Sequence, residues 1–230
     1  MNSTTDFPTF IKLVMVEFGT IPLAGLALIG AVSAASAASE MFLWADDSTF
    51  TAADYVLGAG LLAGWAIVVY AVSMMLAGNR FGIVSFAKYM ATACATVLPI
   101  FVALSLLLLF SILDAGGIVL IAVLPMLASL IPMMLLPGWP ILQATSAKLV
   151  GPVEALRLTS GFRWPLILAS FALGAINRVV PASSATDEFT TVCLLAAIGG
   201  VVSMFSAMFG LSVSVAAWRL MTTARGPMVA

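Results

Sequence analysis

Six long apolar segments separated by short polar breaks most constrain how this chain can fold. A transmembrane helix needs roughly 20 mainly apolar residues to cross the hydrocarbon core of a bilayer. Hydrophobic residues make up 63% of the 230 positions and charged residues only 8%, whereas about a quarter of residues are charged in soluble domains. The sequence therefore predicts an all-α, polytopic membrane protein with a single membrane domain, 1–230. The expected spans are 21–39, 55–77, 90–113, 117–136, 164–182 and 190–218.

The basic residues predict the orientation of these spans. Eight of the nine Lys and Arg residues fall in segments that would share one side of the membrane, and only Arg178 falls towards the other. Cytoplasmic loops are enriched in Lys and Arg, so the positive-inside rule places both termini in the cytoplasm.

A short interfacial helix is expected at 7–18, before the first span. Asp6 is a preferred capping residue, and Phe10, Val14 and Phe18 would lie along one side of the helix. The alternative is one uninterrupted helix that continues into the first span.

A second interfacial region is expected at 141–160, within the longest cytoplasmic segment. Proline and glycine break the chain before it, and Gly151–Pro152 opens a further short helix. Lys148, Arg157 and Arg163 would then lie near anionic lipid headgroups.

Small residues at helical spacing predict close contacts between helices. Gly60 and Gly64 form a GxxxG pattern, and Ser206, Gly210 and Ser214 follow one another at four-residue steps. Such faces let two backbones approach closely inside a membrane. The sequence leaves open whether they face partners within the fold or another subunit.

Two side chains within the spans need polar partners. Trp65 falls in the middle of its span, and its indole N–H is expected to bond to a neighbouring helix. Arg178 lies too deep in its predicted span for its charge to lack a partner. An ion pair with Asp187, Glu188 or Asp114 is therefore expected. A role for Arg178 in a substrate or proton pathway is the alternative.

Catalytic and metal chemistry have little support in the sequence. The chain has no histidine, which excludes a Ser-His or Cys-His nucleophile. No span carries two carboxylates at helical spacing, as an aspartyl mechanism or a metal site would require. We therefore expect no enzyme activity, no cofactor and no metal. With a net charge of −1, the sequence offers nothing that predicts nucleic-acid binding.

One segment resembles a known family. Residues Gly151–Trp164 read GPVEALRLTSGFRW, which is similar to the cytoplasmic helix and following span of bacterial polytopic proteins related to the membrane domain of some glycerophosphodiester phosphodiesterases. The resemblance implies a similar membrane architecture in a bacterial cytoplasmic (inner) membrane. It covers fourteen residues and transfers no activity.

Three functions follow from these features. The leading hypothesis is a non-catalytic accessory subunit or scaffold that associates with membrane lipids and other membrane proteins. The alternative is a small transporter or channel with Arg178 near the pathway. An intramembrane enzyme is a remote third.

Overall fold

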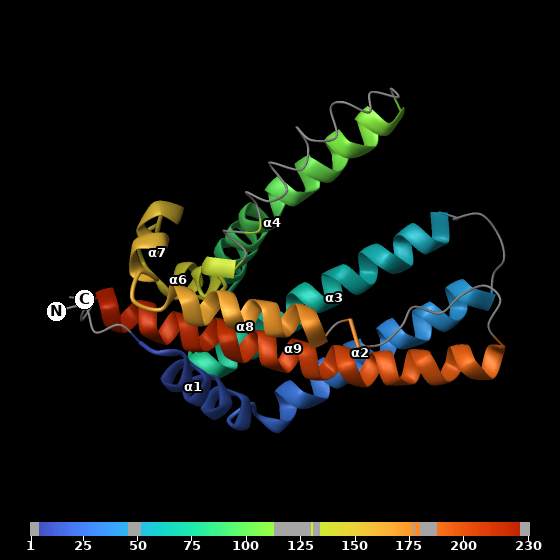
Figure 1. The fold of residues 1–230 in the computed structure, drawn as a ribbon, viewed down its shortest axis with the longest axis horizontal. Helices are drawn as coiled ribbons and strands as arrows, with labels where there is room; N and C mark the ends of the chain where they lie inside the picture. The colour runs from blue at the N-terminus through green and yellow to red at the C-terminus, as the bar shows by residue number, and fades with distance from the viewer. Residues whose placement is uncertain are drawn as a thin grey trace. The chain divides into compact units, whose positions relative to one another are not determined.

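All regular secondary structure in the described part of the chain is helical (Figure 1). The computed structural model describes residues 5–45, 52–112, 130, 134–176, 178–179 and 188–225. Its helices are α1 (Phe7–Gly19), α2 (Leu23–Ala45), α3 (Ala52–Ala77), α4 (Ile83–Ile112), α6 (Trp139–Thr145), α7 (Pro152–Leu158), α8 (Arg163–Ile176) and α9 (Phe189–Arg225). The predicted all-α fold class is confirmed for these residues.

Two described helices are long and apolar enough to cross a membrane, Val56–Ala77 within α3 and the whole of α9. A third is added if α1 and the following Leu23–Ser39 form one broken span. α8 is apolar but has only 14 residues, which at 1.5 Å per residue gives about 21 Å. Most of the predicted span 117–136 lies outside the described residues, as does the end of 164–182.

The start of α1 is capped as the sequence predicts. The Asp6 carboxylate accepts a hydrogen bond from the backbone N–H of Thr9, with an N···O distance of 3.2 Å. Hydrogen bonds from the side chain and the backbone of Thr9 hold the pKa of Asp6 below its ordinary value of 3.8. The cap satisfies one of the N–H groups that a helix start leaves without a partner.

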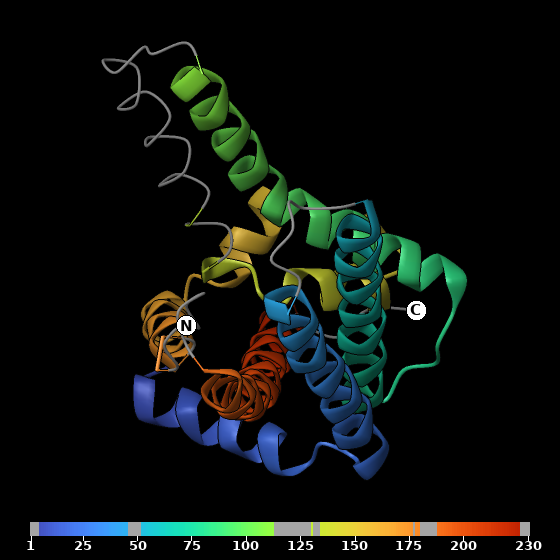
Figure 2. The ribbon, with the colours of Figure 1, turned by 90° about the vertical axis from the view of Figure 1, so that its right-hand side faces the viewer.

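α1 is a separate helix from α2. It ends at Gly19, and the chain turns by 89° before α2 begins at Leu23, as Figure 2 shows. The alternative of one uninterrupted helix from residue 7 through the first span is therefore wrong. Pro22 lies in the break, where its ring is compatible with a helix start but not with a helix interior.

The chain divides into two compact units. Unit 1 comprises Met1–Ile11, Phe81–Ile167 and Val213–Ala230, and unit 2 comprises Lys12–Arg80 and Leu168–Ser212. α1, α8 and α9 each contribute residues to both units, as their bounds show.

In unit 2, α2 and α3 pack side by side (Figures 1 and 2). A Cβ placed on Gly25 of α2 would lie 3.3 Å from the side chain of Val72 in α3, so glycine permits the two helices to approach closely. Further along the same pair, the indole N–H of Trp65 donates to the hydroxyl of Ser36 at 3.1 Å. The expectation that Trp65 bonds to a neighbouring helix is confirmed.

In unit 2, α2 also makes a close contact with the part of α9 that belongs to this unit. A Cβ on Gly200 would lie 3.2 Å from the Cβ of Ala37. The rings of Phe18 and Phe205 are tilted against each other, with centroids 5.4 Å apart. Small residues thus bring α2 and α9 together, and an aromatic pair packs Phe18 of α1 against the same part of α9.

In unit 1, α4 packs against α6, and Gly138, just before α6, touches the backbone of α9. A Cβ on Gly138 would lie 2.6 Å from the backbone nitrogen of Trp218 and 3.1 Å from the carbonyl oxygen of Ser214. The φ of Gly138 is −84°, which any residue can adopt. Glycine is required here by space and not by backbone conformation.

We predict that Gly138→Ala destabilises the protein by about 1–3 kcal/mol, because the added methyl overlaps a backbone that has no side chain to move aside. The matched control is Gly151→Ala, where a Cβ meets nothing within 4 Å. Thermal unfolding of both variants in detergent would check this. Equal melting temperatures for Gly138→Ala and Gly151→Ala would contradict the close approach.

Candidate functional site

The first candidate site is the segment that links α6 to α8 in unit 1, together with the C-terminal end of α9. We call residues 139–163 and 213–225 the basic platform. α6 begins at Trp139–Pro140, with proline in the first helical turn, where its missing N–H costs nothing. Residues Trp139 to Gln143 are all buried. α6 therefore packs inside the protein. The expectation that 141–160 is an interfacial region is wrong for α6. α7, in contrast, is mostly exposed.

The loop between α6 and α7 is held by buried hydrogen bonds. The indole N–H of Trp139 donates to the carbonyl of Val150 at 2.9 Å, and the Val150 N–H donates to Gln143 Oε1 at 2.8 Å. The ammonium group of Lys88 on α4 donates to the carbonyl of Ser146 at 3.1 Å. Both backbone groups of Val150 are thus satisfied by side chains, as burial demands.

The end of α9 is bonded to the same loop. The indole N–H of Trp218 donates to Thr145 Oγ1 at 3.2 Å. Arg225 pairs with Glu154 of α7 at 3.2 Å and donates to the hydroxyl of Ser146 at 3.3 Å. An ion pair as exposed as this one contributes only about 0–1 kcal/mol.

The start of α1 is also attached to the platform. The N–H of Thr5 donates to the carbonyl of Gly161 at 2.9 Å, and the ring of Phe10 stacks on that of Phe162 with centroids 6.3 Å apart. Both rings are buried. The start of α1, α4, residues 139–163 and the end of α9 therefore meet in unit 1.

The three predicted headgroup residues all lie on the platform with exposed side chains. Lys148 and Arg157 are exposed, and Arg163 is exposed while donating to the carbonyl of Leu156 at 2.9 Å. That bond satisfies a carbonyl at the C-terminal end of α7. Trp164, beside Arg163, is 75% exposed, and tryptophan favours the membrane–water interface.

The predicted packing residues have different surroundings. A Cβ on Gly64 would lie 4.0 Å from Val32, and one on Gly210 would lie 3.4 Å from Leu173, whereas a Cβ on Gly60 meets nothing within 4 Å. Ser206 is buried, and the carbonyl of Ser214 is close to Gly138, as described above. All except Gly60 therefore lie within the fold.

The contact between α2 and α9 at Gly200 was not among the predicted ones. It uses Gly200 and Ala37, whereas the spacing argument selected other positions on α9. Gly30, Ala34 and Ala37 follow one another at three- or four-residue steps on α2. That spacing of small residues is the sequence pattern from which this face of α2 could have been predicted.

Arg178 is exposed and lies just beyond the end of α8. Of its predicted partners, Glu188 is described and exposed, whereas Asp114 and Asp187 lie outside the described residues. The ion pair therefore stays a prediction. Among the described residues, no three Cys, Asp or Glu side chains lie together as a metal site would require.

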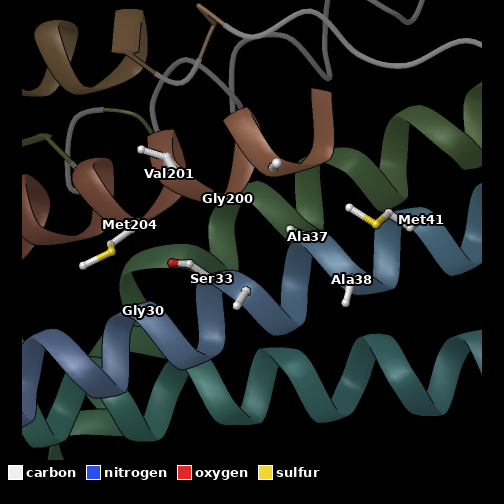
Figure 3. Close-up of a pocket in the computed structure, with 10 residues that line it drawn as sticks. Gly30, Ser33, Ala37, Ala38, Met41, Gly200, Val201 and Met204 are labelled. Atoms are coloured by element: carbon white, nitrogen blue, oxygen red, sulfur yellow. The ribbon is translucent and has the colours of Figure 1, made fainter. Parts of the chain in front are cut away.

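The second candidate site is a groove in unit 2 between α2 and α9, with a volume of about 320 Å³ (Figure 3). Its lining is almost entirely small or flexible apolar residues, and Ser33 supplies its one side-chain oxygen. Ser33 is 2% exposed, and its hydroxyl has no hydrogen-bond partner among the residues that the structure describes, a state that costs about 1–3 kcal/mol. The lining residues are Gly30, Ser33, Ala34, Ala37, Ala38, Met41, Ala197, Gly200, Val201 and Met204.

Comparison with known proteins assigns no family. No family model, curated protein or solved structure was found to match this chain. The functional argument therefore depends on the residues and their geometry, and the resemblance of Gly151–Trp164 to the phosphodiesterase-associated membrane domain stays a prediction.

We predict that Trp139→Phe loosens the platform, because it leaves the buried carbonyl of Val150 without its donor at a cost of about 1–3 kcal/mol. The matched control is Trp164→Phe, in which an exposed indole is replaced. Hydrogen exchange at residues 146–151 should accelerate in Trp139→Phe only. Equal exchange in both variants would contradict the assigned role of the Trp139 bond.

Proposed function

We propose that this chain is a non-catalytic integral membrane subunit or scaffold that associates laterally with other membrane proteins and lipids. The observation that carries the proposal is the exposure of large apolar side chains along helices of membrane-spanning length. Val56 and Leu62 on α3 are each 73% exposed, and Val201 on α9 is 70% exposed. Only 22% of the most apolar stretch of α3 and 17% of that of α9 is buried within the chain.

Such surfaces need a partner or a hydrocarbon solvent. Exposing apolar area to water costs about 25 cal/mol per Å², and contiguous apolar patches are characteristic of interfaces with proteins or membranes. Within a bilayer this cost disappears, and association between helices then depends on close packing of small residues. Gly60 on α3, which meets nothing within 4 Å, is a small-residue position available for such a contact.

In the proposed topology the chain crosses a bacterial inner membrane six times, with both termini in the cytoplasm. The distribution of Lys and Arg among the loops supports this orientation. The basic platform is then cytoplasmic, where Lys148, Arg157 and Arg163 are available to anionic headgroups. Each basic residue near an anionic surface contributes about 1 kcal/mol of attraction.

The transporter alternative has less support. It requires Arg178 to line a water-filled path, and the exposed position of Arg178 beyond α8 does not favour that role. A non-catalytic membrane subunit needs no such path, and it accounts for the apolar faces directly.

We predict that a photocrosslinking amino acid at Leu62 captures lipid or another membrane protein when the chain is expressed in a bacterial membrane. The matched control is the same substitution at Tyr70 on α3, an aromatic residue that is only 6% exposed. The control should give crosslinks within the chain alone. Products would be identified by mass spectrometry after extraction in mild detergent.

Two results would contradict the proposal. One is recovery of the chain as an uncrosslinked monomer from both positions in intact membranes. The other is recovery of the chain in the aqueous fraction, which would show that its apolar faces are covered without a membrane.

A further inference from the structure

We propose that the groove between α2 and the unit 2 part of α9 binds one acyl chain of a membrane phospholipid, with its ester carbonyl accepting a hydrogen bond from Ser33. This inference rests on the proposed function, since only a chain embedded in a membrane meets such a lipid at this groove. It adds a defined site, a stoichiometry of one acyl chain and a polar anchor.

The dimensions of the groove suit one extended chain. Along α2 its lining runs from Gly30 to Met41, a length of about 16 Å at 1.5 Å per residue. A volume of about 320 Å³ over that length leaves a mean cross-section of about 20 Å². This area matches the cross-section of a single alkyl chain.

The same dimensions exclude a helix from a second copy of this chain. A helix about 10 Å across has a cross-section of about 80 Å², roughly four times that of the groove. Side-chain movement alone cannot widen the groove where Gly200 and Ala37, which both line it, bring the two helices close together. A second copy would cover the groove without filling it.

The walls suit a hydrocarbon ligand. Gly30, Ala37 and Gly200 leave space beside the two backbones, and Met204 stands over Gly30, with its sulfur 3.7 Å from a Cβ placed there. Methionine is unbranched and polarisable, so Met204 and Met41 can adjust to a chain of variable conformation.

Ser33 supplies the polar contact that a lipid ester needs. Figure 3 shows its hydroxyl on the side of α2 that faces α9, towards Met204. The hydroxyl is buried and has no hydrogen-bond partner within the described part of the chain. A buried hydroxyl without a partner in an otherwise apolar groove marks the position where a ligand oxygen is favoured, because apolar pockets orient their ligands through few polar groups.

Native mass spectrometry of the full chain in detergent, titrated with palmitoyl-oleoyl phosphatidylethanolamine, tests the proposal. The wild-type chain should retain one lipid more tightly than any further lipid. Ala34→Phe places a ring in the groove from an exposed position that lines it and should weaken this first binding by about tenfold or more. Ser33→Ala should weaken it about fivefold, the effect of one neutral hydrogen bond.

Two further variants keep the test decisive. Ala27→Phe makes the same change at an exposed position of α2 outside the groove and should bind lipid as the wild type does. If Ala34→Phe fails to fold, Ala197→Phe fills the groove from α9, and Ser33→Ala remains informative because it removes only an unpartnered hydroxyl.

Equal lipid affinity in the wild type, Ala34→Phe and Ser33→Ala would overturn the proposal. So would a change in the number of chains per particle with an unchanged lipid count in Ala34→Phe, which would assign the groove to a second copy. If the wild type retains no lipid but still gives partner crosslinks at Leu62, the groove proposal fails while the proposed function stands.

Discussion

In the proposed membrane location, the absence of hydrogen-bonding solvent inside a bilayer is the constraint on which this structure depends. A backbone in hydrocarbon has to satisfy its own N–H and C=O groups, and among single segments only helices do so. Every described element is accordingly a helix. The exceptions are equally informative, because where the chain leaves helical geometry in a buried place, side chains supply the missing partners. Trp139 and Gln143 do this for both polar groups of Val150.

The same constraint explains how the helices are held together. Lipid is as apolar as a leucine side chain, so burial of apolar area gives little driving force between helices in a membrane, and close packing of small residues takes its place. Gly25 against Val72 and Gly200 against Ala37 are such contacts. Small residues that bring two backbones together also leave narrow spaces beside the contact. The groove at Ser33 is one of these spaces, and its buried hydroxyl distinguishes it from an ordinary packing defect.

Local features of the sequence predicted a substantial part of the fold. The helical class follows from composition, the start of α1 from its capping residue Asp6, and the partner of Trp65 from the cost of an unpaired indole N–H. Pairings between distant segments were not predictable. Helices that are apolar all round carry little signal about which face is buried, so the Gly200–Ala37 contact was missed.

The candidate site was predicted only in part. The basic residues of the platform were identified by their charge and position, but the burial of α6 was not, because it depends on the approach of Gly138 to the distant end of α9. In the sequence Gly138 is indistinguishable from a loop glycine. The groove was not predictable from the sequence, since its lining residues on α2 and those on α9 lie more than 150 positions apart in the chain.

The central claim is that the charges of this chain sort across a membrane, with the platform on the cytoplasmic side. Its most direct test is single-cysteine labelling in a background with Cys94 and Cys193 replaced, using a maleimide that does not cross membranes. Lys148 and Glu188 are both exposed and are predicted on opposite sides. Glu188→Cys should be labelled in intact bacterial cells, and Lys148→Cys only after permeabilisation. The reverse pattern, or equal labelling of both, would contradict the account.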